Sequence, residues 1–87
     1  MTFDDMMTVE ACVAALVPAG EPRPPVMRAL TYDRVEIDLS HWEAPHQTAM
    51  RDSLAKDLAK AGHPEWEVWF ADGKMNTLFV SEREEAV

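Results

Sequence analysis

The chain of 87 residues has 47% hydrophobic and 28% charged side chains, enough for one small core and too apolar to remain disordered. Eight lysines and arginines stand against sixteen acidic residues, which gives a formal net charge of −8. This charge argues against direct binding to nucleic-acid phosphates or to an anionic membrane, and it favours a basic partner.

The first predicted element is an amphipathic helix over residues 2–17. Thr2 is a suitable N-cap, and Pro18 followed by Gly20 ends the helix. Apolar residues recur at spacings of three and four, as expected for one buried helix face: Met6, Val9, Val13 and Leu16.

Four of the six prolines lie within residues 18–25, so this segment is expected to be extended and stiff. We interpret it as a connector that leads from the helix to a sheet. A polyproline ligand for an aromatic groove is the alternative, which the flanking residues Gly20 and Glu21 do not favour.

Residues 26–39 have the pattern of β-structure with one buried and one solvent-exposed face. The second half alternates strictly, with Val35, Ile37 and Leu39 on one side and Arg34, Glu36 and Asp38 on the other. The first half is out of phase with this alternation, so a break falls near residues 32–34. The break is either the turn of a hairpin, which we favour, or a bulge that bends one long strand.

A second helix is predicted after residue 40. Residues 40–43, Ser-His-Trp-Glu, have the spacing of a capping box, and Pro45 is tolerated in a first turn. Gly62 followed by Pro64 ends the helix. Trp42 either closes one end of the core or anchors a partner. The apolar face repeats at four, four and three residues: Met50, Leu54, Leu58 and Ala61.

A β-hairpin is predicted over residues 66–80, because Asp72-Gly73 suits a two-residue turn. With those two residues as the loop, Val68 lies opposite Thr77. The core side of the hairpin is then formed by Trp66, Val68, Phe70, Met75, Thr77 and Phe79. The opposite side is formed by Glu67, Trp69, Asn76 and Leu78.

The order of these elements predicts an α+β fold with two layers. We expect an antiparallel or mixed sheet of three to four strands with two helices on one face, which leaves the other face open. Residues 1–80 form the expected single globular domain, and residues 81–87 form a flexible acidic tail.

The histidine, cysteine and serine residues of the chain fit no catalytic or metal-binding sequence motif. His41 and His46 are five residues apart across a proline, and His63 lies at a helix end. Cys12 belongs to an apolar helix face, so we expect no metal and no cofactor. Ser40 and His41 are merely adjacent in sequence, and no glycine-rich phosphate loop exists, so we expect a protein that is not an enzyme.

Cysteine usage and hydropathy indicate a cellular setting. The single cysteine excludes an internal disulfide, and small secreted domains usually need several, so we expect a cytoplasmic protein. The longest apolar run, residues 11–17, is much shorter than the roughly 20 residues of a membrane span.

An acidic surface is the remaining candidate functional feature. Two pairs of glutamate or aspartate residues stand two apart on predicted strands, so each pair points the same way. On the helix-free face, the four carboxylates would surround an apolar patch of one tryptophan and one leucine. The alternative is a merely solvated face on which the proline segment or the tail covers the tryptophan. The candidate partner-binding residues are Glu36, Asp38, Glu65, Glu67, Trp69 and Leu78.

These observations favour an inhibitor or regulator that docks its acidic face on a basic protein surface, for example that of a nucleic-acid-binding complex. Small acidic phage or plasmid proteins, including anti-CRISPR and anti-restriction proteins, use this strategy; the analogy is one of size and charge alone. One alternative is a structural subunit that forms a homodimer or small assembly through the open sheet face. Another is a small ligand-binding domain or enzyme.

Overall fold

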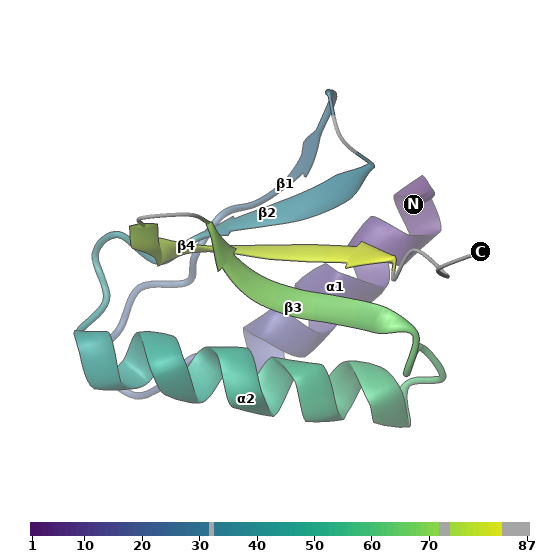
Figure 1. Ribbon diagram of the computed structural model, residues 1–87. Helices are drawn as coiled ribbons and strands as arrows, with labels where there is room; N and C mark the ends of the chain where they lie inside the picture. Colours follow the sequence, from purple (N-terminus) through teal and green to yellow (C-terminus); the bar gives the residue numbers. More distant parts are fainter. Residues whose placement is uncertain (32, 72–73, 83–87) are drawn as a thin grey trace.

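The computed structural model describes residues 1–31, 33–71 and 74–82. Its elements are α1 (Phe3–Ala15), β1 (Val26–Ala29), β2 (Arg34–Asp38), α2 (Ala44–Lys60), β3 (Trp66–Ala71) and β4 (Lys74–Glu82). The strands form one antiparallel sheet in the order β1-β2-β4-β3, and both helices pack on one face of it (Figure 1). The predicted two-layer α+β fold is therefore confirmed. Within the described ranges, no helix is long and apolar enough to cross a membrane.

Helix α1 begins with the predicted cap. The Asp5 N–H donates to the Thr2 hydroxyl at 3.2 Å, and the Thr2 N–H donates to the Asp5 carboxylate at 2.9 Å. The C-cap is Leu16, so the helix stops just before Pro18, whose ring could not continue it.

The proline-rich segment runs as a connector from α1 to β1, and side-chain contacts with α1 and with the loop before α2 hold it in place. The Trp42 indole N–H donates to the Pro22 carbonyl oxygen at 2.8 Å, and Arg23 forms an ion pair with Glu10 of α1 at 3.0 Å. Trp42 is itself 5% exposed, so it closes one end of the core, in line with the first of its two interpretations.

Strands β1 and β2 form an antiparallel hairpin with Val26 opposite Ile37, which resolves the choice between a hairpin and one bulged strand. The first strand is shorter than expected: it ends at Ala29. Leu30 lies beyond its end and is 99% exposed. Tyr32, at the predicted break, lies outside the described residues.

The start of α2 differs from the prediction: its N-cap is Glu43, not Ser40. A helix that began at residue 41 would place Pro45 in its interior, where the ring clashes with the carbonyl group four residues earlier. A helix that begins at Ala44 keeps Pro45 in the first turn, where the missing N–H costs nothing.

A loop takes the place of the expected first turn, and a side chain of α2 forms hydrogen bonds with the carbonyl oxygens of this loop. The buried Gln47 amide donates to the carbonyl oxygens of Leu39 and Trp42, both at 3.0 Å. Further along α2, the predicted apolar face is buried at Met50, Leu54 and Leu58.

Strands β3 and β4 pair as predicted, but the predicted register is wrong. Val68 lies opposite Val80 rather than Thr77. The predicted turn residues, Asp72-Gly73, lie outside the described residues.

The register changes because three additional β4 residues, 75–77, intervene between two consecutive pairs of the ladder. Thr77 pairs with Asp38 of β2 instead of with β3. Since three is odd, the shift exchanges the two faces of β4, and Leu78 and Val80 become fully buried. Burying such a side chain contributes about 1.5–3 kcal/mol, which favours this register over one that buries the threonine.

The main core lies between the sheet and the helices, while Phe79, on the other face of the sheet, is also buried at 7% exposure. The fully buried side chains of the main core are Val9, Val13, Val35, Ile37, Leu39, Leu54, Leu58, Leu78 and Val80. Ser81 and Glu82 were predicted to lie in a flexible tail, but they belong to β4. The rest of that expected tail, residues 83–87, lies outside the described residues.

Candidate functional site on the open sheet face

Alternate residues of the strands form the sheet face that neither helix covers. Its residues on the three longer strands are Arg34, Glu36 and Asp38 from β2, Glu67 and Trp69 from β3, and Thr77, Phe79 and Ser81 from β4. Glu36 lies opposite Phe79, and Phe79 lies opposite Trp69. One carboxylate and two aromatic rings therefore form a row across the sheet.

The centre of this face is a cluster of Arg34, Trp69 and Phe79, which we call the aromatic cluster. The two rings pack with centroids 4.7 Å apart and planes tilted by 58°. The guanidinium carbon of Arg34 lies 3.8 Å from the Phe79 centroid and 5.6 Å from the Trp69 ring. The Trp69 indole N–H donates to the Ser81 hydroxyl at 3.1 Å, so the indole is held in place.

Carboxylates from two strands flank the aromatic cluster. Glu36 and Asp38 project from β2, and Glu67 projects from β3 on the same face. Hydrogen bonds from the side chain and the N–H of Ser40 lower the pKa of Asp38, and the positive charge of a protonated His41 would lower it further. Asp38 therefore stays ionised at neutral pH.

Two of the predicted site residues lie elsewhere. Leu78 is fully buried in the core, because the register shift turns it to the opposite face of β4. Glu65 precedes β3 in the turn after α2, where its carboxylate lies 3.5 Å from His63 Nδ1, so it does not project from the sheet. The prediction of a patch of Trp69 and Leu78 surrounded by four carboxylates is wrong on these two points.

The structure adds Phe79 and Arg34 to the site. The position of Arg34 on this face could have been predicted from the sequence, because Arg34 alternates in phase with Glu36 and Asp38. The position of Phe79 could not have been predicted, because the face on which it lies depends on the register between β3 and β4, which the turn residues do not determine. The aromatic centre is thus a ring pair with a stacked cation, in place of the expected tryptophan and leucine.

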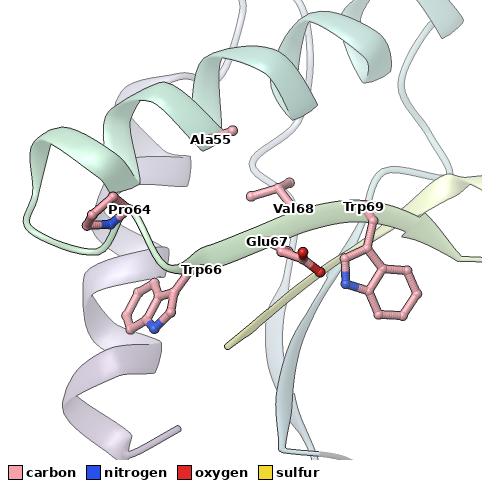
Figure 2. Close-up of a pocket in the computed structure, with 6 residues that line it drawn as sticks. All are labelled: Ala55, Pro64, Trp66, Glu67, Val68 and Trp69. Atoms are coloured by element: carbon pink, nitrogen blue, oxygen red, sulfur yellow. The ribbon is translucent and has the colours of Figure 1, made fainter. Parts of the chain in front are cut away.

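A shallow, open hollow of about 520 Å³ adjoins this face at the outer edge of β3. Figure 2 shows Ala55 of α2 above the strand, with Glu67 and Trp69 of the sheet face contributing to the same hollow. The remaining lining residues are Pro64, Trp66 and Val68. Because β3 ends the strand order, this hollow runs beside a terminal strand.

Packed aromatic rings, a guanidinium group and carboxylates recognise partners without covalent chemistry. The one cysteine, Cys12, lies in α1, away from this face, and burial together with the charge of Asp57 raises the pKa of its thiol. A raised pKa makes a thiol a poor nucleophile at neutral pH. Among the described residues, the group able to hold a metal ion also lies elsewhere, near the start of α2: Glu21, Glu43 and His46.

Comparisons of the chain with protein-family models, curated proteins and solved structures found no match. A function for this protein therefore has to be inferred from the geometry of the chain itself.

Proposed function

We propose that the protein is a non-enzymatic interaction module, an inhibitor or regulator that docks the open face of its sheet on a basic protein surface. The aromatic cluster carries this proposal: Trp69 and Phe79 pack under Arg34 on a face that neither helix covers. A face with no such centre would be only a solvated sheet surface.

The composition of the cluster supports an anchoring role. Tryptophan and arginine are enriched among the residues that dominate binding energy, and these residues lie near the centres of interfaces. Trp69 is half-buried and already held by Phe79 and Ser81, so it would lose little side-chain freedom on binding.

The surrounding charge supports a basic partner. The carboxylates of Glu36, Asp38 and Glu67, within a chain of net charge −8, would attract a basic surface over roughly the Debye length, about 10 Å at 0.1 M salt. A protein that otherwise holds nucleic acid presents such a surface, and anti-CRISPR and anti-restriction proteins are examples of small acidic inhibitors that would use it. We place this encounter in the cytoplasm, where the free thiol would remain reduced.

The test begins with a partner captured from the source organism by the parent protein. Binding kinetics with the purified partner should then separate residues that slow dissociation from residues that speed association through long-range attraction. Trp69→Ala should weaken binding by about 2 kcal/mol, roughly 30-fold, chiefly through faster dissociation. Glu36→Lys should instead slow association and flatten its dependence on salt.

Asp52→Lys is the matched control, because it makes the same charge change on α2, which packs against the other face of the sheet. It should slow association less than Glu36→Lys. Equal effects would mean that net charge alone governs the encounter. A Trp69→Ala protein that binds like the parent, or tight binding of the parent to DNA or RNA, would contradict the proposal.

Self-association is the second candidate function, and the position of β3 favours it. This six-residue strand ends the sheet, contains no proline and borders the hollow described above. Unprotected terminal strands readily pair with another chain. The molecular mass in solution at several salt concentrations distinguishes the two candidates, since the interaction module is a monomer without its partner.

A further inference from the structure

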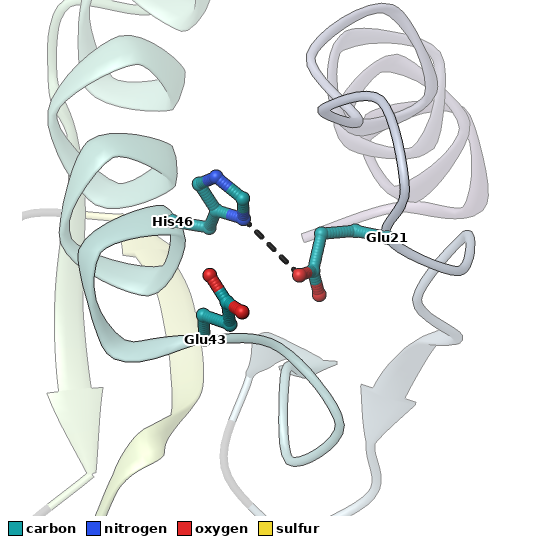
Figure 3. A group of neighbouring side chains, drawn as sticks. All are labelled: Glu21, Glu43 and His46. Atoms are coloured by element: carbon teal, nitrogen blue, oxygen red, sulfur yellow. Dashed lines mark hydrogen bonds and ion pairs between the residues drawn. The ribbon is translucent and has the colours of Figure 1, made fainter.

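The proline-rich connector and the start of α2 bring three side chains of the metal-ligating type together. Glu21 belongs to the connector, while Glu43 and His46 belong to the first turn of the helix and its cap. One potential ligand atom from each residue lies within 4.8 Å of the other two. His46 Nδ1 is 3.1 Å from Glu21 Oε1, and the Glu43 carboxylate points toward both groups (Figure 3).

Local structure explains why the three groups converge. Glu43 and His46 are three residues apart at the beginning of a helix, which places them on the same side. The connector is fixed beside them, because the Trp42 indole bonds the Pro22 carbonyl oxygen directly after Glu21. The cluster is therefore preorganised by contacts that do not involve its own side chains.

The carboxylate of Glu21 is the observation that points to a ligand. Only 8% of this side chain is exposed, and its Oε2 atom is buried without a hydrogen-bond partner among the described residues. Burying a carboxylate oxygen without a hydrogen-bond partner costs free energy. His46 forms a hydrogen bond with Oε1 and leaves Oε2 without a partner among the described residues.

Glu43 gives the second indication. It is the N-cap residue of α2, yet its side chain makes no capping hydrogen bond to the helix. A simple ion pair between His46 and Glu21 explains neither the uncommitted carboxylate of Glu43 nor the buried Oε2 atom. It would also set a single imidazole against two neighbouring carboxylates, which repel each other.

We propose that Glu21, Glu43 and His46 form a binding site for a divalent first-row transition metal ion, with Zn²⁺ as the best match. One imidazole nitrogen and two carboxylate oxygens suit Zn²⁺, whereas Mg²⁺ and Ca²⁺ prefer ligands that are all oxygen. Three protein ligands leave a fourth position of a tetrahedral ion for water or another donor.

The geometry and the charge are compatible with such an ion. Zinc bonds of about 2.0–2.2 Å place tetrahedral ligand atoms about 3.3–3.6 Å apart. The His46 and Glu21 atoms are already near this separation, and rotation of the exposed Glu43 side chain closes the remainder. The N-terminal end of α2 carries roughly half a positive charge, which two carboxylates outweigh.

The ion would act as a clamp between the connector and α2. Sequence spacing gave no hint of this site, because Glu21 and Glu43 are 22 positions apart and only one histidine takes part. The site is separate from the open sheet face, so it stands independently of the proposed function.

Isothermal titration of tag-free, chelator-treated protein with ZnCl₂ tests the proposal. We expect one ion per chain, with much weaker binding of Mg²⁺ and Ca²⁺. Glu21→Gln and Glu43→Gln should each weaken zinc binding by about tenfold or more, since even residues that only support a ligand contribute that much. Glu43 is exposed, so its variant keeps the test valid should the buried Glu21→Gln variant fold poorly.

His63 and Glu65 provide the matched control, because their side chains form another histidine and glutamate pair, at 3.5 Å, outside this cluster. The double variant His63→Ala, Glu65→Gln should bind zinc like the parent. Zinc should also raise the unfolding temperature of the parent more than that of Glu43→Gln at the same zinc concentration. No saturable binding at millimolar zinc, unchanged affinity in both glutamate variants, or loss of affinity in the control would overturn the proposal.

Discussion

Asp38 and Ser40 show how one short contact redirects the chain at the end of β2. The Ser40 N–H donates to the Asp38 carboxylate at 2.9 Å, two residues back in sequence. Aspartate and serine favour such local turns as readily as they favour helix caps. The serine that sequence spacing assigned to a helix cap therefore ends a strand, and its hydrogen bonds lower the pKa of Asp38.

This contact predicts a stability difference that depends on pH. Because the pKa of Asp38 is lower in the folded chain than its ordinary value of about 3.9, folding favours the ionised form. The resulting stabilisation is present above that ordinary value and is lost as pH falls through the folded pKa. Asp38→Asn should therefore destabilise the protein at pH 7, and this effect should be smaller at pH 3, as measured by urea unfolding.

Ser40→Ala is the control for this pH effect, since it removes the largest cause of the shift, the side-chain hydrogen bond. It should reproduce part of the difference at neutral pH. The effect is small because the carboxylate is largely solvated. An equal loss of stability at both pH values for Asp38→Asn would contradict the assignment.

At the scale of the elements, periodicity predicted which residues share a face of one helix or strand. It failed to predict the register between two strands. The apolar repeat located both helices, and alternation placed Glu36, Asp38 and Trp69 on their observed face. Placing Phe79 and Leu78 required the register between two strands, which three additional residues in β4 changed. The hydrophobic effect selects that register globally, by burying Leu78, so a local turn motif does not reveal it.

The helix that periodicity located should be essential for stability. Leu54 is fully buried on α2, so Leu54→Ala should cost about 2–5 kcal/mol of the free energy of unfolding through lost burial and a new cavity. Leu30→Ala makes the same chemical change at a side chain that is 99% exposed, and it should stay within about 0.5 kcal/mol of the parent. Urea unfolding measures both, and similar costs for the two variants would contradict the described core.

At the scale of the whole molecule, the order of the predicted elements indicated a small α+β protein, while the order of the strands in the sheet could not be read from it. The strand order β1-β2-β4-β3 places β4 between β2 and β3, although α2 and β3 precede it in the chain. That order brings Glu36 of β2 beside Phe79 of β4, and thus creates the aromatic cluster with a carboxylate next to it. The group of Glu21, Glu43 and His46 likewise depends on packing between distant segments.

Net charge is the property of the whole molecule that composition does fix, and it predicts how the fold responds to salt. Folding gathers a charge of −8 within a radius of gyration of 12.2 Å. The Debye length falls from about 30 Å at 0.01 M to about 3 Å at 1 M salt, so charges repel across the whole molecule only at low salt. The ion pairs are mostly exposed and individually weak, so screening them removes little.

Sodium chloride should therefore raise the urea midpoint of unfolding at pH 7, because it relieves more repulsion than attraction. The same salt series near pH 4.6, the isoelectric point, is the control: the net charge vanishes there, and the midpoint should become nearly independent of salt. A midpoint that falls with salt at pH 7 would mean that specific ion pairs dominate the electrostatics of the fold. In that case the carboxylates would serve mainly to stabilise the structure, and their proposed role in attracting a basic partner would lose its basis.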